Sequence, residues 1–470
     1  MRDNLKSEHT PTEKAVNTAL QPASTFGQAW PRPLLGWWVV ALLLLVGMLG
    51  MLDQIIMSLM VDPIKTALGL SDTQMGLVQG PAFGVATALS VIPCGWLVDR
   101  VNRCKFMAMG VTFWSLMTAM CGLASGFGTL VLARACVGMG EATLRPTPPS
   151  LISDCFPPPQ RPLAIGVFTL FGPIGVGSAV IIGGYVAAAI LGNPSVSLPV
   201  FGTVESWRAV FLGVALPGIL LGALLLFLRE PARQEVHCDE SAHGMRGFFR
   251  GHWRVVLPHF AGVAITSGLL QGIMNWVPAF FIRTFAWNPA TVGLRFGLTF
   301  LIAGVTGTLC VSFIAKTRRQ RGRVNANLST LSGIVALATV PAFAAPLMSD
   351  ASTVLALFGV TTFLIAGVLA LSFAAIVDYT PNRLRGRVSA IFTLGISLLG
   401  TLGPAFVGFG GDHLFAGRGG IGAALAALGL FCIPGAILIG VSARQQRRAI
   451  ESRSKVSRQM SSEDLSHVGV

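Results

Sequence analysis

The chain has 470 residues, of which 53% are hydrophobic and 11% are charged. Soluble domains usually carry about 25% charged residues, so this composition excludes an ordinary soluble protein and indicates one that crosses a membrane several times. The formal net charge of +14 would also suit a nucleic-acid partner, but the cations cluster between apolar runs, which gives the charge another explanation.

Apolar runs of roughly 20 residues, each long enough to cross the ~30 Å hydrocarbon layer, recur along the chain. A polar tail at residues 1–34 comes first, and we expect it to be disordered. The run after it has no small-residue cleavage site, which favours a retained span over a signal peptide. The runs predict an all-α fold of twelve transmembrane helices, at 36–60, 74–97, 106–124, 128–151, 163–190, 208–228, 255–282, 290–315, 327–347, 353–377, 387–410 and 419–442.

The connections between the runs predict the orientation. If the N-terminus is cytoplasmic, most of the 34 Lys and Arg residues fall on the cytoplasmic side, as the positive-inside rule requires. We therefore expect a multi-pass protein of a bacterial inner membrane, with both termini cytoplasmic, the lipid bilayer around it and no nucleic-acid partner. A polar loop at 229–254 separates two six-span halves, 35–228 and 255–442, and a disordered cytoplasmic tail is expected at 443–470.

Motifs for chemistry are missing from the sequence. The eight cysteines form no CxxC pair, so neither a disulfide framework nor a metal site is predicted. We find no HExxH, GxSxG or phosphate-binding loop. The sequence therefore predicts no catalytic residue and no cofactor, and a polytopic enzyme is disfavoured.

Two cytoplasmic turns repeat each other. The segment "DCFPPPQRPLAIGVFTL" follows the fourth span, and "DYTPNRLRGRVSAIFTL" follows the tenth. Asp154 matches Asp378 and Arg161 matches Arg385 at a constant separation of 224 positions. Six-span halves with matching turns are the internal symmetry of secondary transporters whose halves move about a central site.

A charged turn, "CGWLVDRVNRCKF" at 94–106, lies between the second and third spans. It resembles the signature loop of the major facilitator superfamily through Gly95, Leu97, Asp99, Arg100, Arg103 and Lys105, with Asn102 in place of the usual glycine. A weaker basic turn, "AKTRRQRGR", stands at the equivalent place in the second half. The resemblance covers about 36–442 and implies two pseudo-symmetric six-helix bundles.

Charge pairing in this turn would let it act as a cytoplasmic gate. A carboxylate at the end of span 2 can pair with arginines of its own turn and of a neighbouring helix end, and Gly95 would permit close helix approach. The alternative is that the cations only set the topology, which leaves Asp99 unexplained. The predicted gate residues are Gly95, Asp99, Arg100, Arg103, Lys105, Asp154, Arg161, Asp378 and Arg385.

Charged residues also occur inside the spans, where each costs roughly 2.5–3.5 kcal/mol on insertion scales and needs a reason. Span 4 contains Arg134, Glu141 and Arg145, whose spacing of seven and four predicts one shared helix face. Span 1 contains Asp53. A carboxylate in a low-dielectric cavity can load and release a proton at usable pH. The alternative for Glu141 is a bracing ion pair with Arg134 or Arg145.

These residues are also similar to the spinster-like branch of the superfamily, together with "LSDTQMGLV" (70–78), "RACVGMGEA" (134–142) and "SDCFPPPQR" (153–161). The resemblance implies that Asp53 and Glu141 couple transport to protons. Gln54 stands where that branch has Arg, and Arg145 is an additional cation. We hypothesise that Arg145 replaces the missing charge near the cavity.

Polar stripes follow two spans of the second half. Ser267, Gln271 and Asn275 recur every four residues in span 7, with Trp276 beside them, and span 11 has the stripe Ser389, Thr393, Ser397 and Thr401. Such stripes turn toward protein or a water-filled cavity, and the alternative is hydrogen bonding between helices. The predicted substrate-binding residues are Arg134, Arg145, Gln271, Asn275, Trp276, Thr393 and Ser397.

The sequence thus predicts a secondary active transporter, acting as a monomer, that moves a small amphipathic or anionic organic solute by alternating access with a proton gradient as driving force. The resemblance implies lysolipid or sphingoid substrates in the spinster-like branch, and sugar acids or aromatic acids elsewhere in the superfamily. Two alternatives stay open: a drug or lysolipid exporter of the same fold, and a membrane ligand sensor that does not transport.

Overall fold

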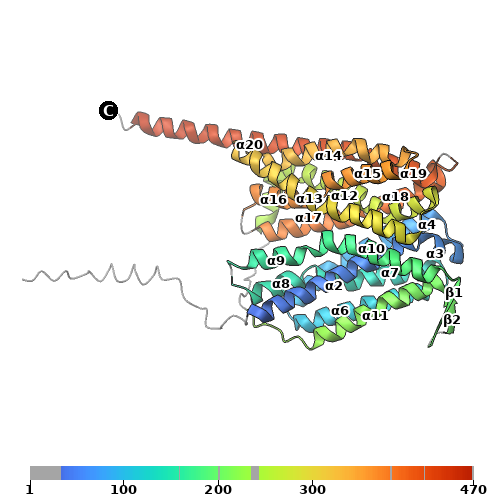
Figure 1. Ribbon diagram of the computed structural model, residues 1–470. Coiled ribbons are helices and arrows are strands. Elements are labelled where there is room, and N and C mark those ends of the chain that lie inside the picture. Colours follow the sequence, from blue (N-terminus) through green and yellow to red (C-terminus); the bar gives the residue numbers. More distant parts are fainter. Residues whose placement is uncertain are drawn as a thin grey trace, which may run out of the picture.

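The computed structural model describes residues 33–157, 159–199, 202–233, 243–381, 384–417 and 419–467. Within these ranges, 12 helical segments are long and apolar enough to cross a membrane, which confirms the predicted spans. They run side by side, the amino-terminal half (blue to green) forming one layer and the carboxy-terminal half (yellow to red) the other (Figure 1). The expected disorder of the N-terminal tail concerns residues that, up to 32, lie outside the described ranges.

The amino-terminal bundle holds the first six spans. Its elements are α2 (Pro33–Leu59), the short α3 (Val61–Leu68), α4 (Asp72–Leu77), the π-helical η1 (Val78–Ala82), α5 (Phe83–Val98), α6 (Arg103–Gly122), α7 (Phe127–Glu141), η2 (Ala142–Leu144), α8 (Thr147–Cys155), α9 (Arg161–Thr169), α10 (Phe171–Leu191) and α11 (Ser206–Leu226). Before α11, β1 (Ser195–Leu198) pairs antiparallel with β2 (Gly202–Glu205), from Ser195 opposite Glu205 to Leu198 opposite Gly202.

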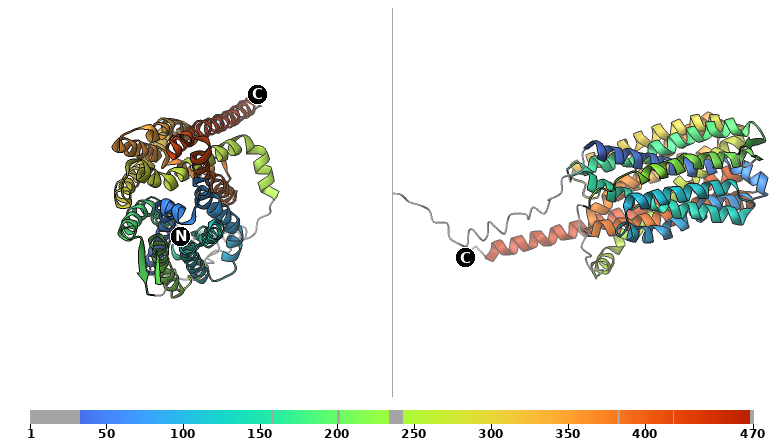
Figure 2. Two further views of the ribbon diagram at one scale, coloured as in Figure 1. Left: turned by 90° about the vertical axis from the view of Figure 1, so that its right-hand side faces the viewer. Right: turned by 90° about the horizontal axis from the view of Figure 1, so that it is seen from below.

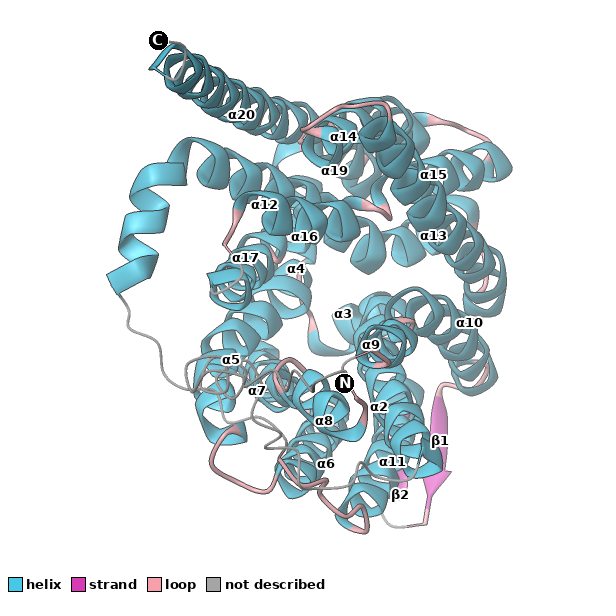
Figure 3. Cartoon of the chain, turned by 90° about the vertical axis from the view of Figure 1, so that its left-hand side faces the viewer, coloured by secondary structure: helices cyan, strands magenta, loops and turns pink. Residues whose placement is uncertain are grey.

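The carboxy-terminal bundle holds the other six. Its elements are α12 (His243–Phe285), α13 (Pro289–Gln320), α14 (Ala326–Ala344), η3 (Ala345–Leu347), α15 (Ala351–Ile365), α16 (Val368–Tyr379), α17 (Arg385–Gly400), α18 (Leu402–Phe409), the π-helical η5 (Gly410–Leu414), α19 (Gly420–Gly429) and α20 (Cys432–His467). Viewed end-on, the two bundles meet along α5 and α17 on one side and along α10 and α13 on the other (Figure 3).

Glycines allow the bundles to touch in the half of the molecule away from the start of α2, which is the outer half in the predicted orientation. A Cβ atom on Gly184 of α10 would lie 2.6 Å from the Cα of Gly293 in α13, so the two backbones are in direct contact. A Cβ on Gly76 of α4 would lie 2.6 Å from the carbonyl oxygen of Pro404 in α18. Small residues at such crossings let helices pack through their backbones.

The fourth span is broken near its middle. Helix α7 ends at Glu141, a 3-10 turn follows, and α8 begins at Thr147. The prolines of "RPTPPS" explain the break, because a proline ring removes a helix hydrogen bond and clashes with the preceding turn. The prediction of a common face assumed one continuous helix; Arg134 and Glu141 do lie in the same helix, α7, but Arg145 lies beyond the break.

Two polar segments are more helical than predicted. The tail 443–470 continues the last span as α20 as far as His467 and extends beyond the body of the molecule (Figure 2). Its sequence contains five Arg and three Gln, which are good helix formers, and no proline or glycine before 469. The expected loop 229–254 likewise ends early, because α12 begins at His243.

Candidate substrate cavity and its two faces

A cavity of about 300 Å³ lies between the two bundles. Both halves of the chain line it, mostly with apolar and aromatic side chains and with a few polar groups at intervals. The lining residues are Met51, Gln54, Ile55, Phe83, Arg145, Val176, Ser267, Leu270, Gln271, Met274, Asn275, Phe300, Leu369, Phe373, Thr393, Ile396 and Ser397. Cavities of this size and character are typical of sites for small organic molecules.

Five of the predicted substrate-binding residues line this cavity: Arg145, Gln271, Asn275, Thr393 and Ser397. Arg145 is its cation. Its side chain is exposed, and among the described residues no carboxylate forms an ion pair with it. The break after α7 explains its position, because the guanidinium leaves an irregular turn and not the middle of a packed helix.

The other two predicted residues lie elsewhere. Trp276 is fully buried, and its Nε1 donates to the carbonyl oxygen of Pro404 at 2.9 Å, so it packs between helices and does not line the cavity. The prediction assumed that Trp276 would line the cavity because it is adjacent to Asn275 in the sequence. Adjacent residues of a helix point in different directions, so the assumption was wrong. Arg134 is only 2% exposed and borders a smaller chamber next to the cavity.

A buried ionic pair lies behind the cavity wall. Arg134 Nη1 is 3.8 Å from Oδ2 of Asp53, and the other carboxylate oxygen of Asp53 accepts a hydrogen bond of 2.7 Å from Thr118. The Arg134 guanidinium also lies 5.1 Å from the ring centroid of Phe83. Both charged side chains are 2% exposed, so each stabilises the other's charge away from water.

Glu141 has a different partner from those proposed for it. Its Oε2 accepts a hydrogen bond of 3.1 Å from Gln54 Nε2, and its side chain lies against Gly50 of α2. Among the described residues no salt bridge joins Glu141 to Arg134 or Arg145, although both cations lie near enough to act on its carboxylate. Gln54 also lines the cavity, and it therefore connects the buried carboxylate to the cavity wall.

An ion-pair network connects the bundles at the end of the molecule that is the outer face in the predicted orientation, and the sequence did not predict it. Arg283 of α12 donates to Asp62 at 2.7 Å and to both oxygens of Asp72 at 2.8 and 2.9 Å. Lys65 donates to Asp72 at 2.8 Å. We call Asp62, Lys65, Asp72 and Arg283 the outer network. Asp62 and Lys65 lie in α3, Asp72 lies in α4 and Arg283 lies in α12. A charged residue near the end of a span does not by itself indicate which distant residue it pairs with.

A carboxylate from the other bundle caps the second span. Asp412 of η5 accepts from the backbone N–H of Thr73 at 2.6 Å and from its hydroxyl at 2.7 Å. Thr73 lies in the first turn of α4, where unpaired N–H groups favour negative charge. This contact and the outer network join the bundles at the same end of the molecule.

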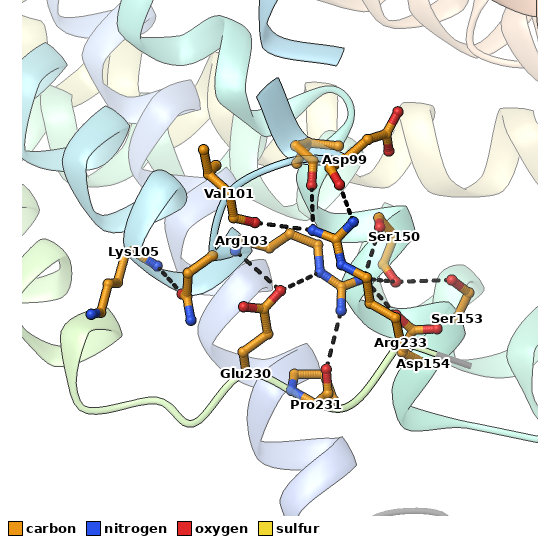
Figure 4. A network of polar contacts seen from close by, with 12 residues as sticks. Asp99, Val101, Arg103, Lys105, Ser150, Ser153, Asp154, Glu230, Pro231 and Arg233 are labelled. Atoms are coloured by element: carbon orange, nitrogen blue, oxygen red, sulfur yellow. Dashed lines mark hydrogen bonds and ion pairs between the residues drawn. The ribbon is translucent and has the colours of Figure 1, made fainter. Parts of the chain in front are cut away.

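A second cluster, around Arg103, lies at the opposite end of the molecule, which is the cytoplasmic face in the predicted orientation. This cytoplasmic cluster connects elements of a single bundle. Arg103 is 2% exposed and donates to Glu230 at 2.8 Å, to Ser150 Oγ at 2.9 Å and to Asp154 (Figure 4). Arg233 donates to the carbonyl oxygens of Val98, Asp99 and Val101, which fixes the turn after α5. Glu230 and Arg233 are partners that the motif does not reveal.

Several predicted gate residues make no gate contact in this conformation. The side chain of Asp99 is exposed and points away from the cluster (Figure 4), so its predicted pairing with arginine is not formed. A Cβ on Gly95 would meet nothing within 4 Å, so the predicted close helix approach is wrong here. Arg100 stacks on Trp96 at 3.9 Å, and Lys105 is exposed. Asn102 caps α6 by accepting from the Lys105 N–H.

The carboxy-terminal bundle has a related cluster around Asp378, in the turn that the sequence matches to the turn of Asp154. Asp378 accepts from Arg319 at the end of α13 and from Asn327 at the start of α14, whereas Asp154 accepts from Arg103 at the start of α6. Arg385 Nε donates to the carbonyl of the residue five positions earlier at 3.2 Å, and Arg161 Nε does the same at 2.9 Å. Each cluster joins elements of its own half, so none of these contacts bridges the bundles at the cytoplasmic face.

In the described parts of the chain, no group of three or more His, Cys, Asp or Glu residues is placed so that it could hold a metal ion.

Comparison with known proteins agrees with this architecture. The family model of the Major Facilitator Superfamily matches residues 42–404. An MFS-type efflux pump of Mycolicibacterium smegmatis is 28% identical over 89% of this chain and 95% of its own length. A hexuronate transporter of Bacillus subtilis is 24% identical (79% and 87%), and human protein spinster homolog 1 is 27% identical (80% and 73%).

Solved structures show the same fold. A bacterial homolog of the human lysosomal transporter spinster, in an inward-facing and unoccupied conformation, superimposes with a TM-score of 0.77 at 22% identity, covering 88% of this chain and 98% of that one. A D-xylose–proton symporter gives a TM-score of 0.63 at 15% identity, covering 85% and 96%. The relatives are transporters and not enzymes, and the chain belongs to the major facilitator superfamily of membrane transport proteins.

Proposed function

We propose that this protein is a secondary transporter that carries an amphipathic organic anion by alternating access, driven by protons. The observation that supports this most directly is Arg145, an exposed cation that forms no salt bridge among the described residues and lines a largely apolar cavity between the bundles. A cation in such surroundings is costly, and an anionic group on the substrate would compensate it.

The cavity wall supports the amphipathic character of the substrate. Phe83, Phe300 and Phe373 supply aromatic surface around the cavity, and Met51 and Met274 supply flexible apolar surface. A volume of about 300 Å³ suits a small organic acid or a short alkyl chain. The hexuronate transporter among the relatives is named for an organic anion.

Alternating access is supported by the asymmetry of the two faces. The outer network and Asp412 connect the bundles on one side, while the contacts described above for the clusters on the other side each stay within one bundle. In the opposite state, Asp99, Gly95, Arg100 and Lys105 would come into contact with the carboxy-terminal bundle. The gate role of the predicted residues belongs to that state.

Proton coupling is supported by the two buried carboxylates. Asp53 is 2% and Glu141 6% exposed, and each has one oxygen without a hydrogen-bond partner. Glu141 reaches the cavity through Gln54, so a proton or a substrate in the cavity can change its hydrogen bonding. We further propose a monomer in a bacterial inner membrane with both termini cytoplasmic.

The experiment compares Arg145→Gln with Arg321→Gln, which removes an exposed cation from the cytoplasmic turn after α13. Both variants are purified and reconstituted in liposomes, and a panel of radiolabelled organic acids is tested by counterflow. We expect Arg145→Gln to reduce affinity at least tenfold, because one charge-assisted contact contributes about 1.5–3 kcal/mol. Equal counterflow in both variants would refute the anion site, and binding without counterflow in the wild type would favour the sensor.

A further inference from the structure

A second compartment adjoins the substrate cavity. This chamber has a volume of about 10 Å³ and is lined by Gln54, Gln79, Gly80, Phe83, Arg134, Gln271, Asn275, Thr401 and Pro404. Four of these residues, Gln54, Phe83, Gln271 and Asn275, also line the main cavity, so the two compartments share a wall. The volume is close to the smallest that holds one oxygen-sized group.

The chamber lies toward the closed outer face. A Cβ on Gly80 of η1 would lie 2.2 Å from the carbonyl oxygen of Thr401, so the second and eleventh spans are in backbone contact there. The chamber therefore forms the outer end of the site, at the seam that would separate in an outward-open state.

Several polar atoms of the chamber lack hydrogen-bond partners. Gln79 is 4% exposed, and neither its Oε1 nor its Nε2 has a hydrogen-bond partner. Arg134 is 2% exposed, and its Nε and Nη1 also have none. Buried polar atoms are almost always paired in folded proteins, so several unpaired atoms around one chamber point to a ligand group that pairs with them.

The backbone at Gln79 is also unusual. Residues Val78–Ala82 form a π-helical turn with Pro81 inside it. Single π turns within α-helices occur frequently at functional sites, because the extra residue changes the direction of a side chain. Here the turn presents the Gln79 amide to the chamber.

We propose that this chamber is a hydroxyl-binding subsite and that the preferred substrate is a hydroxylated organic anion. A hydroxyl oxygen both donates and accepts, which matches the carbonyl and amino ends of the Gln79 amide and the guanidinium of Arg134. The anionic group contacts Arg145 in the main cavity while the hydroxyl occupies the chamber. This inference rests on the proposed function and specifies its substrate class.

The test uses matched pairs of acids that differ in hydroxyl groups: octanoate against 3-hydroxyoctanoate, and hexanoate against gluconate. Dissociation constants are measured by thermal shift on purified wild type, Gln79→Leu and Gln446→Leu. Gln446 is the matched control, since it is also 4% exposed with an unpaired amide but lines neither compartment. Gln79→Met is a second variant if Gln79→Leu is poorly folded.

In the wild type and in Gln446→Leu, we expect at least one hydroxylated acid to bind about threefold to tenfold more tightly than its partner. In Gln79→Leu that ratio should fall to about one. An equal affinity for both members of each pair in the wild type, or a ratio unchanged by Gln79→Leu, would overturn the hydroxyl subsite while leaving the anion function standing. Binding of none of the four acids would overturn both.

Discussion

Replacing Arg283 with glutamine should weaken the closed outer face. The substitution removes the cation that three hydrogen bonds of 2.7–2.9 Å connect to Asp62 and Asp72. Hydrogen bonds to charged groups contribute about 1.5–3 kcal/mol when buried. The side chains of Arg283 and Asp62 are 27% and 33% exposed, so solvent screening lowers their pair to about 1 kcal/mol or less.

Asp72 is better shielded, at 9% exposed, and keeps more of its interaction with Arg283. The closed outer face should therefore lose about 2 kcal/mol in total, which shifts a two-state equilibrium roughly 30-fold toward the open state. Lys65 remains beside Asp72 in the variant and limits the loss.

Hydrogen–deuterium exchange in nanodiscs measures this shift. The segments that contact each other across the outer face, 72–84 and 400–414, should exchange faster in Arg283→Gln. Arg208→Gln is the control, because Arg208 is also an outer arginine but donates only within its bundle, to Glu205 and to two carbonyl oxygens. Unchanged exchange in both segments, or the same increase in the control, would refute the reasoning.

Three further predictions concern single side chains. Gly184→Ala places a Cβ against backbone atoms of the other bundle and should lower the melting temperature by several degrees, from about 1–3 kcal/mol of overpacking, whereas Gly172→Ala meets open space and should not. Asp154→Asn should destabilise the protein by about 1–3 kcal/mol in a thermal melt, because it weakens the buried ion pair with Arg103. Asp99→Asn should have almost no effect, since the carboxylate of Asp99 is exposed, and similar losses in both variants would contradict this assignment. Glu141→Gln should abolish proton-driven accumulation in liposomes while counterflow persists, and accumulation at the wild-type rate would remove Glu141 from the coupling mechanism.

The twelve spans could be predicted because hydrophobic length is a local property that a bilayer enforces on each helix. The matched turns of Arg161 and Arg385 could also be predicted, because the same local sequence in both halves produces the same local hydrogen bond, from the arginine Nε to the carbonyl oxygen five residues earlier. Four cavity residues were found from polar stripes and Arg145 from its charge within a span, because a polar or charged group inside an apolar span has few places to turn.

The remaining features depend on distances between helices, which spacing does not encode. Asp62, Asp72 and Arg283 are brought together only by the packing of α3, α4 and α12. Trp276 directly follows Asn275 in the sequence, but its side chain points toward α18, where it donates to Pro404. The aromatic residues of the cavity, such as Phe83 and Phe300, look like any other lipid-facing or core residue of an apolar span.

The last helix extends rigidly from the final span beyond the body of the molecule. Helix α20 runs from Cys432 in the final span to His467 without interruption, and Ser442 anchors it to α12 through the carbonyl oxygen of Val255. At 1.5 Å per residue, the part beyond Ser442 is roughly 38 Å long. A tilt of the carboxy-terminal half by about 10° would move the tip of this helix by roughly 7 Å, so a fluorophore there would report a rigid-body motion that is smaller at the cavity.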